Sequence, residues 1–237
     1  MSEYLLTLGG LTAGYGGSAA VADVTLTLRR GEILCLVGES GCGKSTLLKA
    51  ILGTTPGLQI LSGSIVLDGE ELTALPPPAR RQVGTRKIGM VFQNPGSAFN
   101  PIRTYKKQFI ETLRSHGLYS AKTFSARVEE AFAKFGLEDC RRILDSCPYE
   151  MSGGMNQRIA VCLSILLADE PTSALDATIQ LQVAGELRRL RDESGIAQIV
   201  VTHNLALAGC LGDRIGVMDA GRLVELGAAD SCLCTGW

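Results

Sequence analysis

Residues 38–45 of this chain read Gly-Glu-Ser-Gly-Cys-Gly-Lys-Ser, and they fill each fixed position of the pattern G-x-x-x-x-G-K-[ST]. The apolar residues 33–37 before them are typical of a buried parallel strand, and residues 46–52 after them have helical character and end at Gly53. Glycines allow successive backbone N–H groups to close around phosphate oxygens, and a helix start adds the positive end of its dipole. The context therefore predicts a phosphate-binding loop rather than a glycine turn that only joins a strand to a helix.

Two side chains of this loop suit a magnesium-bound triphosphate. We expect the ammonium of Lys44 to reach the β- and γ-phosphates and the hydroxyl of Ser45 to hold Mg²⁺. Lys44 is for the same reason a candidate catalytic residue. The residues expected to bind the nucleotide in this loop are Gly38, Ser40, Gly41, Cys42, Gly43, Lys44, Ser45 and Thr46.

The overall composition is that of an ordinary globular protein. With 237 residues, 46% of them hydrophobic, the chain is one large domain or one domain with a lobe. The net charge of −1 gives no electrostatic reason to expect nucleic acid as a partner. The longest apolar run, residues 159–168, is interrupted by Ser164 and is too short to span a bilayer, and the acidic start of the chain does not resemble a signal peptide. We therefore expect a cytosolic protein.

The chain has eight cysteines, which could indicate disulfides or a metal site. They are dispersed, and several fall in runs predicted to be core, so free thiols acting as small apolar residues are the better interpretation. Cys232 and Cys234 form the one close pair, and the absence of further ligands nearby in the sequence makes metal binding there a weak alternative.

The rest of the chain divides into strand-like and helix-like regions. Residues 4–8 and 21–28 alternate apolar with polar residues, as half-buried antiparallel strands do. Residues 105–144 have helical spacing and no convincing strand, which predicts a helical lobe inserted into an α/β core. We expect a long polar helix near 179–194 and a hairpin turn at 219–221. Further strands are expected at 64–67, 88–92, 165–169, 197–201, 214–218 and 222–225.

Two adjacent carboxylates follow one of these expected strands. Asp169 and Glu170 come directly after the apolar residues 165–168. Asp169 can reach Mg²⁺ through water, and Glu170 is placed to polarise the water that attacks the terminal phosphate. The alternative is that the two carboxylates only end an exposed strand. The phosphate loop upstream favours the catalytic interpretation over this one.

A second segment narrows the class of protein. Residues 148–158 contain Met151-Ser152-Gly153-Gly154-Met155, which resembles the hallmark L-S-G-G-Q of the ATP-binding cassette (ABC) family and its variant M-S-G-G-M. In isolation a Ser-Gly-Gly run would be interpreted as a helix cap. Its position shortly before the Asp-Glu pair makes the resemblance strong, and it implies that Ser152, Gly153 and Gly154 contact nucleotide.

Other positions match the family one at a time. Gln93 resembles the glutamine that senses Mg²⁺ and water, Asp176 lies in a run similar to the D-loop, and His203 resembles the switch histidine at the γ-phosphate. Tyr15 fits the aromatic residue that stacks on adenine. The implied fold is α/β: a P-loop NTPase core with a RecA-like parallel sheet, an N-terminal antiparallel β subdomain and an inserted helical subdomain. The implied division assigns 1–93 and 159–237 to the core and 94–158 to the helical subdomain.

The resemblance also implies a role and partners. Residues 93–101 resemble the corresponding segment in the ATPase subunits of peptide and nickel importers, and their sequence is closer to that of the nickel branch. This implies an ATPase with ATP and Mg²⁺ as cofactors, bound peripherally at the cytoplasmic face of a membrane. The implied partners are a second ATPase subunit, identical or homologous, two membrane permeases and, indirectly, a solute-binding protein. Nucleic acid is not expected.

One region departs from the family pattern. Ten residues separate Arg158 from Asp169, whereas relatives have several more. A helix over 153–164 would travel about 18 Å. The return toward the nucleotide takes about 2–6 loop residues, which the sequence does not offer. Either the last helical turn unwinds or the sequence is incomplete there.

An alternative function is therefore a cassette that binds ATP but scarcely hydrolyses it. A soluble cassette ATPase of translation or DNA repair is a third possibility, but the two cassettes or coiled-coil insertion usual in those proteins are not found here.

Overall fold

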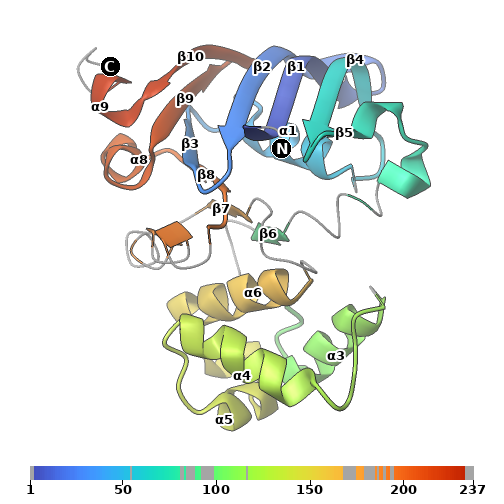
Figure 1. Ribbon diagram of the computed structural model, residues 1–237, viewed down its shortest axis with the longest axis vertical. Helices are drawn as coiled ribbons and strands as arrows, with labels where there is room; N and C mark the ends of the chain where they lie inside the picture. The colour runs from blue at the N-terminus through green and yellow to red at the C-terminus, as the bar shows by residue number, and fades with distance from the viewer. Residues whose placement is uncertain are drawn as a thin grey trace.

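The chain is described by a computed structural model, which covers residues 3–53, 55–80, 83, 89–91, 99–115, 117–167, 175–178, 185, 187–188, 191–192 and 195–232. Two β-sheets form one end of the molecule, and a group of helices forms the other (Figure 1). This arrangement confirms the predicted α/β fold with an antiparallel β subdomain and a helical lobe.

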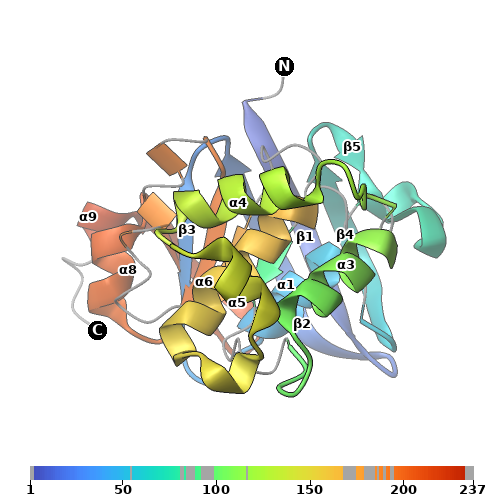
Figure 2. The ribbon, with the colours of Figure 1, turned by 90° about the horizontal axis from the view of Figure 1, so that it is seen from below.

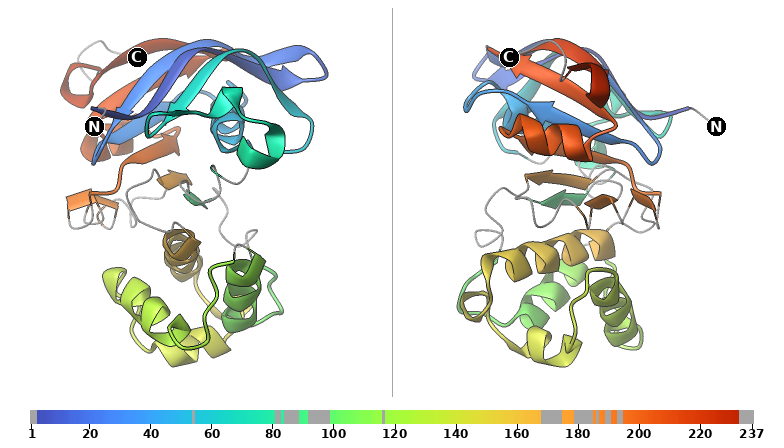
Figure 3. Two further views of the ribbon diagram at one scale, coloured as in Figure 1. Left: turned by 45° about the vertical axis from the view of Figure 1, so that its right-hand side comes forward. Right: turned by 90° about the vertical axis from the view of Figure 1, so that its left-hand side faces the viewer.

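The first sheet is antiparallel and has four strands. Its order is β2 (Ser18–Arg29), β1 (Tyr4–Tyr15), β4 (Leu58–Leu67) and β5 (Glu70–Glu71). The strands are longer than the alternating patterns predicted, because β1 continues through register shifts between Leu8 and Leu11, where Gly10 adopts a φ of 57°. The sheet curves over helix α1 (Lys44–Leu52), as the left view of Figure 3 shows.

The second sheet is mostly parallel and positions the phosphate loop. Its order is β10 (Arg222–Ala228), β9 (Arg214–Asp219), β3 (Ile33–Val37), β8 (Gln198–Thr202), β7 (Leu175–Thr178) and β6 (Gly89–Val91), with β10 antiparallel to β9. All five residues of β3 are buried. Ile33, Cys35 and Val37 belong to one core cluster, and Leu34 and Leu36 belong to the other, so β3 is covered on both faces.

The helical lobe is packed around buried aromatic residues, which belong to the same core cluster as Ile33, Cys35 and Val37 of β3. It contains α3 (Tyr105–Ser115), α4 (Phe124–Lys134), α5 (Cys140–Asp145), the 3₁₀ turn η3 (Pro148–Glu150) and α6 (Gly153–Leu167). Seen from below, these helices lie in front of the sheets (Figure 2). The fully buried rings of Phe109 and Phe132 meet edge to face, with centroids 6.0 Å apart.

Several predicted boundaries are confirmed. Helix α1 ends at Gly53, which adopts the left-handed conformation with φ 68°. The turn between β9 and β10 has Ala220 and Gly221 at φ 43° and 80°, as a tight hairpin requires. Other short elements in the described part of the chain are the 3₁₀ turn η1 (Leu72–Ala74), α8 (Leu205–Leu211) and α9 (Ala229–Cys232).

The strand predicted at 165–169 is wrong. Residues 165–167 are the last residues of α6, which runs without interruption from Gly153. The place between β6 and β8 is filled by β7 instead, where Leu175 pairs with Gly89 on one side and Gln198 on the other. The shortened interval after Arg158 offers no loop residues, so helical hydrogen bonding continues where the chain was expected to reverse. Asp176 consequently lies on a strand and not in the loop that its motif suggested.

Two further observations concern the segments described. No helix there is both long enough and apolar enough to cross a membrane. The cysteines whose side chains are described are free thiols, as predicted: Cys35, Cys42, Cys140, Cys147, Cys162 and Cys210. The side chains of Cys232 and Cys234 lie outside the described part.

Candidate functional site

Two glycines hold the phosphate loop against the neighbouring strands. Gly38 follows β3 with φ 151°, and a Cβ atom there would lie 2.2 Å from the carbonyl oxygen of Met218 in β9. Gly43 is the N-cap of α1 with φ 100°, and its Cβ atom would lie 2.8 Å from Cγ1 of Val21 in β2. Both positions need glycine for backbone conformation and for space.

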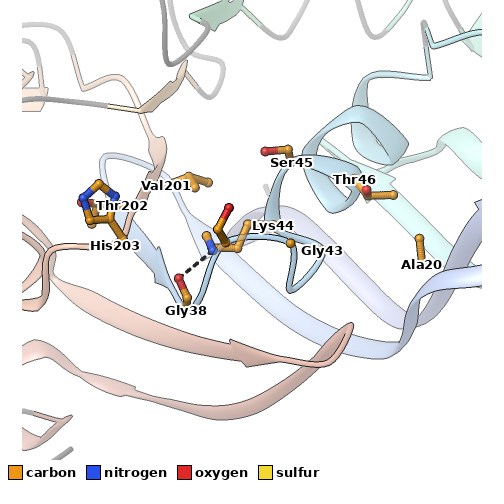
Figure 4. A pocket seen from close by; sticks show the side chains of 11 residues that line it. Ala20, Gly38, Gly43, Lys44, Ser45, Thr46, Val201, Thr202 and His203 are labelled. Atoms are coloured by element: carbon orange, nitrogen blue, oxygen red, sulfur yellow. Dashed lines mark hydrogen bonds between the residues drawn. The ribbon is translucent and has the colours of Figure 1, made fainter.

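The loop borders a cavity of about 230 Å³ at the N-terminal end of α1 (Figure 4). The end of β3, the start of α1, β2 and the end of β8 all contribute to it. The residues that line it are Ala20, Gly38, Ser40, Gly41, Gly43, Lys44, Ser45, Thr46, Val201, Thr202 and His203. The structure thus brings the predicted loop residues together around one opening, with the exception of Cys42.

Lys44 is held inside this loop by backbone oxygens. Its side chain is 9% exposed, and its Nζ donates to the carbonyl oxygens of Gly38 and Glu39 at 2.7 Å each. Figure 4 shows the side chain directed at the Gly38 carbonyl. Both acceptors are neutral, so neither cancels the charge of the ammonium, which remains available to attract an anion.

Cys42 is the predicted loop residue that does not line the cavity. Its thiol is buried, and Sγ lies 3.2 Å from Nζ of Lys44 on the inner side of the loop. The helix that follows favours an anion: its first turn has no acidic residue, and no side chain caps its N-terminus.

His203 reaches the cavity from the end of β8. The parallel register pairs Val37 with Thr202, so the residues that end the two strands lie side by side. His203 is exposed and lines the cavity beside Lys44 (Figure 4). Its role at the γ-phosphate stays a prediction.

Three residues that line the cavity were not predicted from the sequence. Ala20, Val201 and Thr202 were not assigned to the site, although all three border the cavity. The signal for the last two was their place at the end of a strand parallel to β3. Ala20 lies on the β1–β2 hairpin, and its sequence carried no comparable signal.

Tyr15 lies at the end of β1, paired with Ser18 across the hairpin. Its side chain is 42% exposed and does not line the phosphate cavity. An exposed ring beside a hairpin that contributes Ala20 to the cavity is compatible with stacking on a base, and that role stays a prediction.

The Ser-Gly-Gly turn lies in the helical lobe, at the start of α6. Ser152 Oγ accepts a hydrogen bond from the backbone N–H of Met155 at 3.3 Å, so the serine caps the helix. Ser152 and Gly153 are exposed, and neither they nor Gly154 line the cavity of the same chain. The structure therefore does not bring this turn to the phosphate loop within one molecule.

Three predicted site residues, Gln93, Asp169 and Glu170, lie outside the described part of the chain. For Asp176 the backbone is described, on β7, but not the side chain.

Comparison with known proteins fits this geometry. The family model described as "ABC transporter" matches residues 21–173, which include the phosphate loop and the Ser-Gly-Gly turn. The oligopeptide transport ATP-binding protein OppD of Lactococcus lactis subsp. cremoris is 37% identical over 87% of this chain and 63% of its own length. The nickel import ATP-binding protein NikD of Pseudomonas putida is 40% identical over 95% of this chain and 88% of its own length. The chain thus spans less than two thirds of the first of these relatives.

Solved structures agree with the fold. The cbiO1 structure from Clostridium perfringens, part of an ABC transporter complex, superposes with a TM-score of 0.82 at 22% identity, over 99% of this chain and 92% of that one. A dimeric bacterial ABC transporter cassette superposes with a TM-score of 0.78 at 25% identity, over 94% of this chain and 98% of that one. With a matching family model over more than half of its length and a 40%-identical relative along most of both chains, this chain belongs to the ABC transporter family.

Proposed function

We propose that this chain is the ATP-binding and ATP-hydrolysing subunit of an ABC importer. The observation that carries the proposal is the Lys44 ammonium, held at the mouth of a glycine-built loop by two neutral carbonyls and facing a cavity of about 230 Å³. Among the described residues the oxygen partners of this buried cation are neutral, and such a cation is suited to bind a phosphate group.

The donor set of the cavity fits a triphosphate with Mg²⁺. Lys44 would meet the β- and γ-phosphates, and the backbone around Gly41 and Gly43 would surround their oxygens. The hydroxyl of Ser45 lines the same cavity and is an oxygen ligand of the kind that Mg²⁺ prefers. Gln93 and Asp169 would complete that site, and bound Mg²⁺ would neutralise the charge that develops on the phosphates. Tyr15 would hold the adenine.

The site needs a second subunit. Ser152 and Gly154 are held in the helical lobe, away from their own phosphate cavity, so they would cap the ATP bound by an identical or homologous partner. ATP would then join two chains head to tail, and its hydrolysis would release them. We propose the bounds 94–158 for the helical subdomain, which places its end within α6, so that it is continuous with the rest of that helix up to Leu167. This subdomain would pass the movement to two membrane permeases at the cytoplasmic face.

The cargo is proposed from relatives. Proteins named for oligopeptide, peptide and nickel import are 37–40% identical to this chain. We propose peptides or nickel complexes, delivered to the permeases by a solute-binding protein.

ATP binding and ATP hydrolysis are supported by different observations. Binding rests on the described cavity, whereas hydrolysis rests on the family and on Glu170 and His203. The named relatives favour an active importer subunit over a cassette that only binds ATP. The continuation of α6 through Leu167 makes hydrolysis the half that most needs measurement.

Phosphate release from the purified chain in MgATP, measured alone and together with the proposed permease partners, tests this directly. We expect release that needs Mg²⁺ and is lost in Lys44→Ala. Tight ATP binding with no release under either condition would support the binding-only alternative and overturn the hydrolysis half.

A further inference from the structure

A buried polar pair lies behind the Ser-Gly-Gly turn. Asn156, on the first turn of α6, is 7% exposed, and Tyr105, the first residue of α3, is fully buried. The Tyr105 hydroxyl donates a hydrogen bond to Oδ1 of Asn156. Two polar side chains are thus paired inside a lobe whose core is otherwise aromatic and aliphatic.

Asn156 connects this pair to the residues that lead into the turn. Its Nδ2 donates to the carbonyl oxygens of Pro148 at 3.0 Å and Met151 at 3.4 Å. Its backbone N–H donates to the carbonyl oxygen of Ser152 at 2.9 Å. One side chain therefore fixes the chain direction immediately before Ser152 with its amide donors, while its single carbonyl oxygen is used by Tyr105.

Tyr105 connects the pair to the start of the lobe. Its backbone N–H donates to the Ser146 carbonyl oxygen at 3.1 Å, and its ring packs edge to face on Phe99 at 5.1 Å between centroids. Burial raises the pKa of the phenol, so the hydroxyl keeps its proton and remains a donor. The segment around residue 99 and the turn at 152–154 are thereby joined through two side chains.

The turn lies between Met151 and Met155, whose side chains pack against the hydrophobic core. Ser152 and Gly153 are exposed, and the cap hydrogen bond of Ser152 spans 3.3 Å. Directional support from hydrogen bonds comes from the buried side, where each amide donor of Asn156 has a backbone acceptor.

We propose that Tyr105 and Asn156 are positioning residues, which hold the Ser152-Gly153-Gly154 turn in the orientation needed to cap the triphosphate of the other subunit. This inference rests on the head-to-tail dimer of the proposed function. It assigns the pair a role in association across the dimer and none in ATP binding at the phosphate loop of its own chain.

The test uses Tyr105→Phe, which removes the hydroxyl and keeps the ring, and Asn156→Leu, which removes all three side-chain hydrogen bonds. Tyr119→Phe is the matched control, because Tyr119 lies in the same lobe, with its ring beside Arg114. ATP-dependent association of donor- and acceptor-labelled full chains is measured by fluorescence energy transfer. We expect association about tenfold weaker in Tyr105→Phe, because one buried acceptor loses its donor, and unchanged in Tyr119→Phe.

ATP binding by the isolated chains is the second readout. Tyr105→Phe should bind ATP as the unmodified chain does, because the phosphate cavity lies outside the helical lobe. Equal loss of ATP binding and association would overturn the inference in favour of a general structural role.

Rescue in a mixed dimer separates positioning from folding. When Tyr105→Phe chains are mixed with Lys44→Ala chains, one of the two composite sites combines an intact phosphate loop with an intact turn. We expect mixing to restore association above that of either chain alone.

Ser152→Ala mixed with Lys44→Ala is the control for the dimer itself. Rescue in this mixture without rescue of Tyr105→Phe would overturn the inference and leave the dimer standing. Failure of the Ser152→Ala mixture would instead contradict the head-to-tail arrangement on which both rest. If Asn156→Leu does not fold, Tyr105→Phe alone still decides the outcome.

Discussion

The ammonium nitrogen of Lys44 lies 2.7 Å from the carbonyl oxygen of Gly38, so the residue that begins the phosphate loop also holds its only lysine. Gly38 is in turn packed so closely on β9 that a side chain there would collide with the backbone of Met218. The position of the cation therefore depends on a glycine six residues earlier in the chain.

Replacement of Gly38 by alanine should destabilise the protein more than replacement of Gly41. Both glycines have positive φ values, 151° and 85°, but an alanine at Gly41 would meet no atom within 4 Å, whereas at Gly38 it would meet the Met218 oxygen at 2.2 Å. We expect about 1 kcal/mol lost in Gly41→Ala from strain alone and at least about 3 kcal/mol in Gly38→Ala. Urea unfolding of both variants measures this difference, and equal losses would contradict the packing described.

The helical lobe should depend on its aromatic core. Phe109 is fully buried, stacks near Phe99 and meets Phe132 edge to face. Phe109→Ala should cost about 3–5 kcal/mol of unfolding free energy, because it leaves a cavity. Ile102, at 77% exposure, is the control, and Ile102→Ala should change stability by less than about 0.5 kcal/mol. Similar losses in the two variants, measured by thermal unfolding, would show that Phe109 is not a core residue.

Alkaline pH should destabilise the chain partly through Cys35. Burial in β3 raises the pKa of this thiol from 9.0 to about 12, with a smaller contribution from Asp213. The unfolded chain loses the proton near its ordinary pKa while the folded chain keeps it, so the stabilisation is complete below about pH 9 and is lost as pH rises toward 12.

Cys35→Ala should therefore show a shallower fall in unfolding free energy between pH 9 and 11, by up to about 1.4 kcal/mol per pH unit. Cys210→Ala, which removes an exposed thiol, is the control and should follow the unmodified chain. Identical slopes for Cys35→Ala and the unmodified chain would exclude this thiol as a source of the pH dependence.

Glu170 is proposed to polarise the attacking water. Glu170→Gln should keep ATP binding and lower turnover by roughly 10²–10⁴, as expected for a positioned acid–base group. Single-turnover phosphate release and ATP binding are measured on the same preparation. Unchanged turnover would remove Glu170 from this role.

The sequence was sufficient to predict the phosphate loop and most of the sheet. These predictions depended on local features, each of which favours one local structure: glycines at 38, 41 and 43, the apolar run before them, and the helix that ends at Gly53. The helical lobe could also be predicted, since its apolar residues recur at helical spacing.

The segment after Arg158 could not be predicted in the same way. Residues 165–167 are apolar and fit a buried helix as well as a buried strand, so local pattern does not distinguish them. Because the interval after Arg158 has no residues for a loop, residues 165–167 continue the helix. The strand between β6 and β8 is formed by β7 instead. The pairing of Tyr105 with Asn156 could not be predicted either, because they are 51 positions apart in the sequence.

ATP affinity of the full chain, measured by calorimetry for the unmodified protein, Lys44→Ala and Lys49→Ala, tests the central claim most directly. Lys49 lies on the same helix but outside the phosphate cavity. We predict about 10- to 100-fold weaker binding in Lys44→Ala, because a charge-assisted contact to phosphate is lost, and unchanged binding in Lys49→Ala. Undiminished affinity in Lys44→Ala, or equal weakening in both variants, would contradict the claim that this lysine and its glycine loop bind the triphosphate.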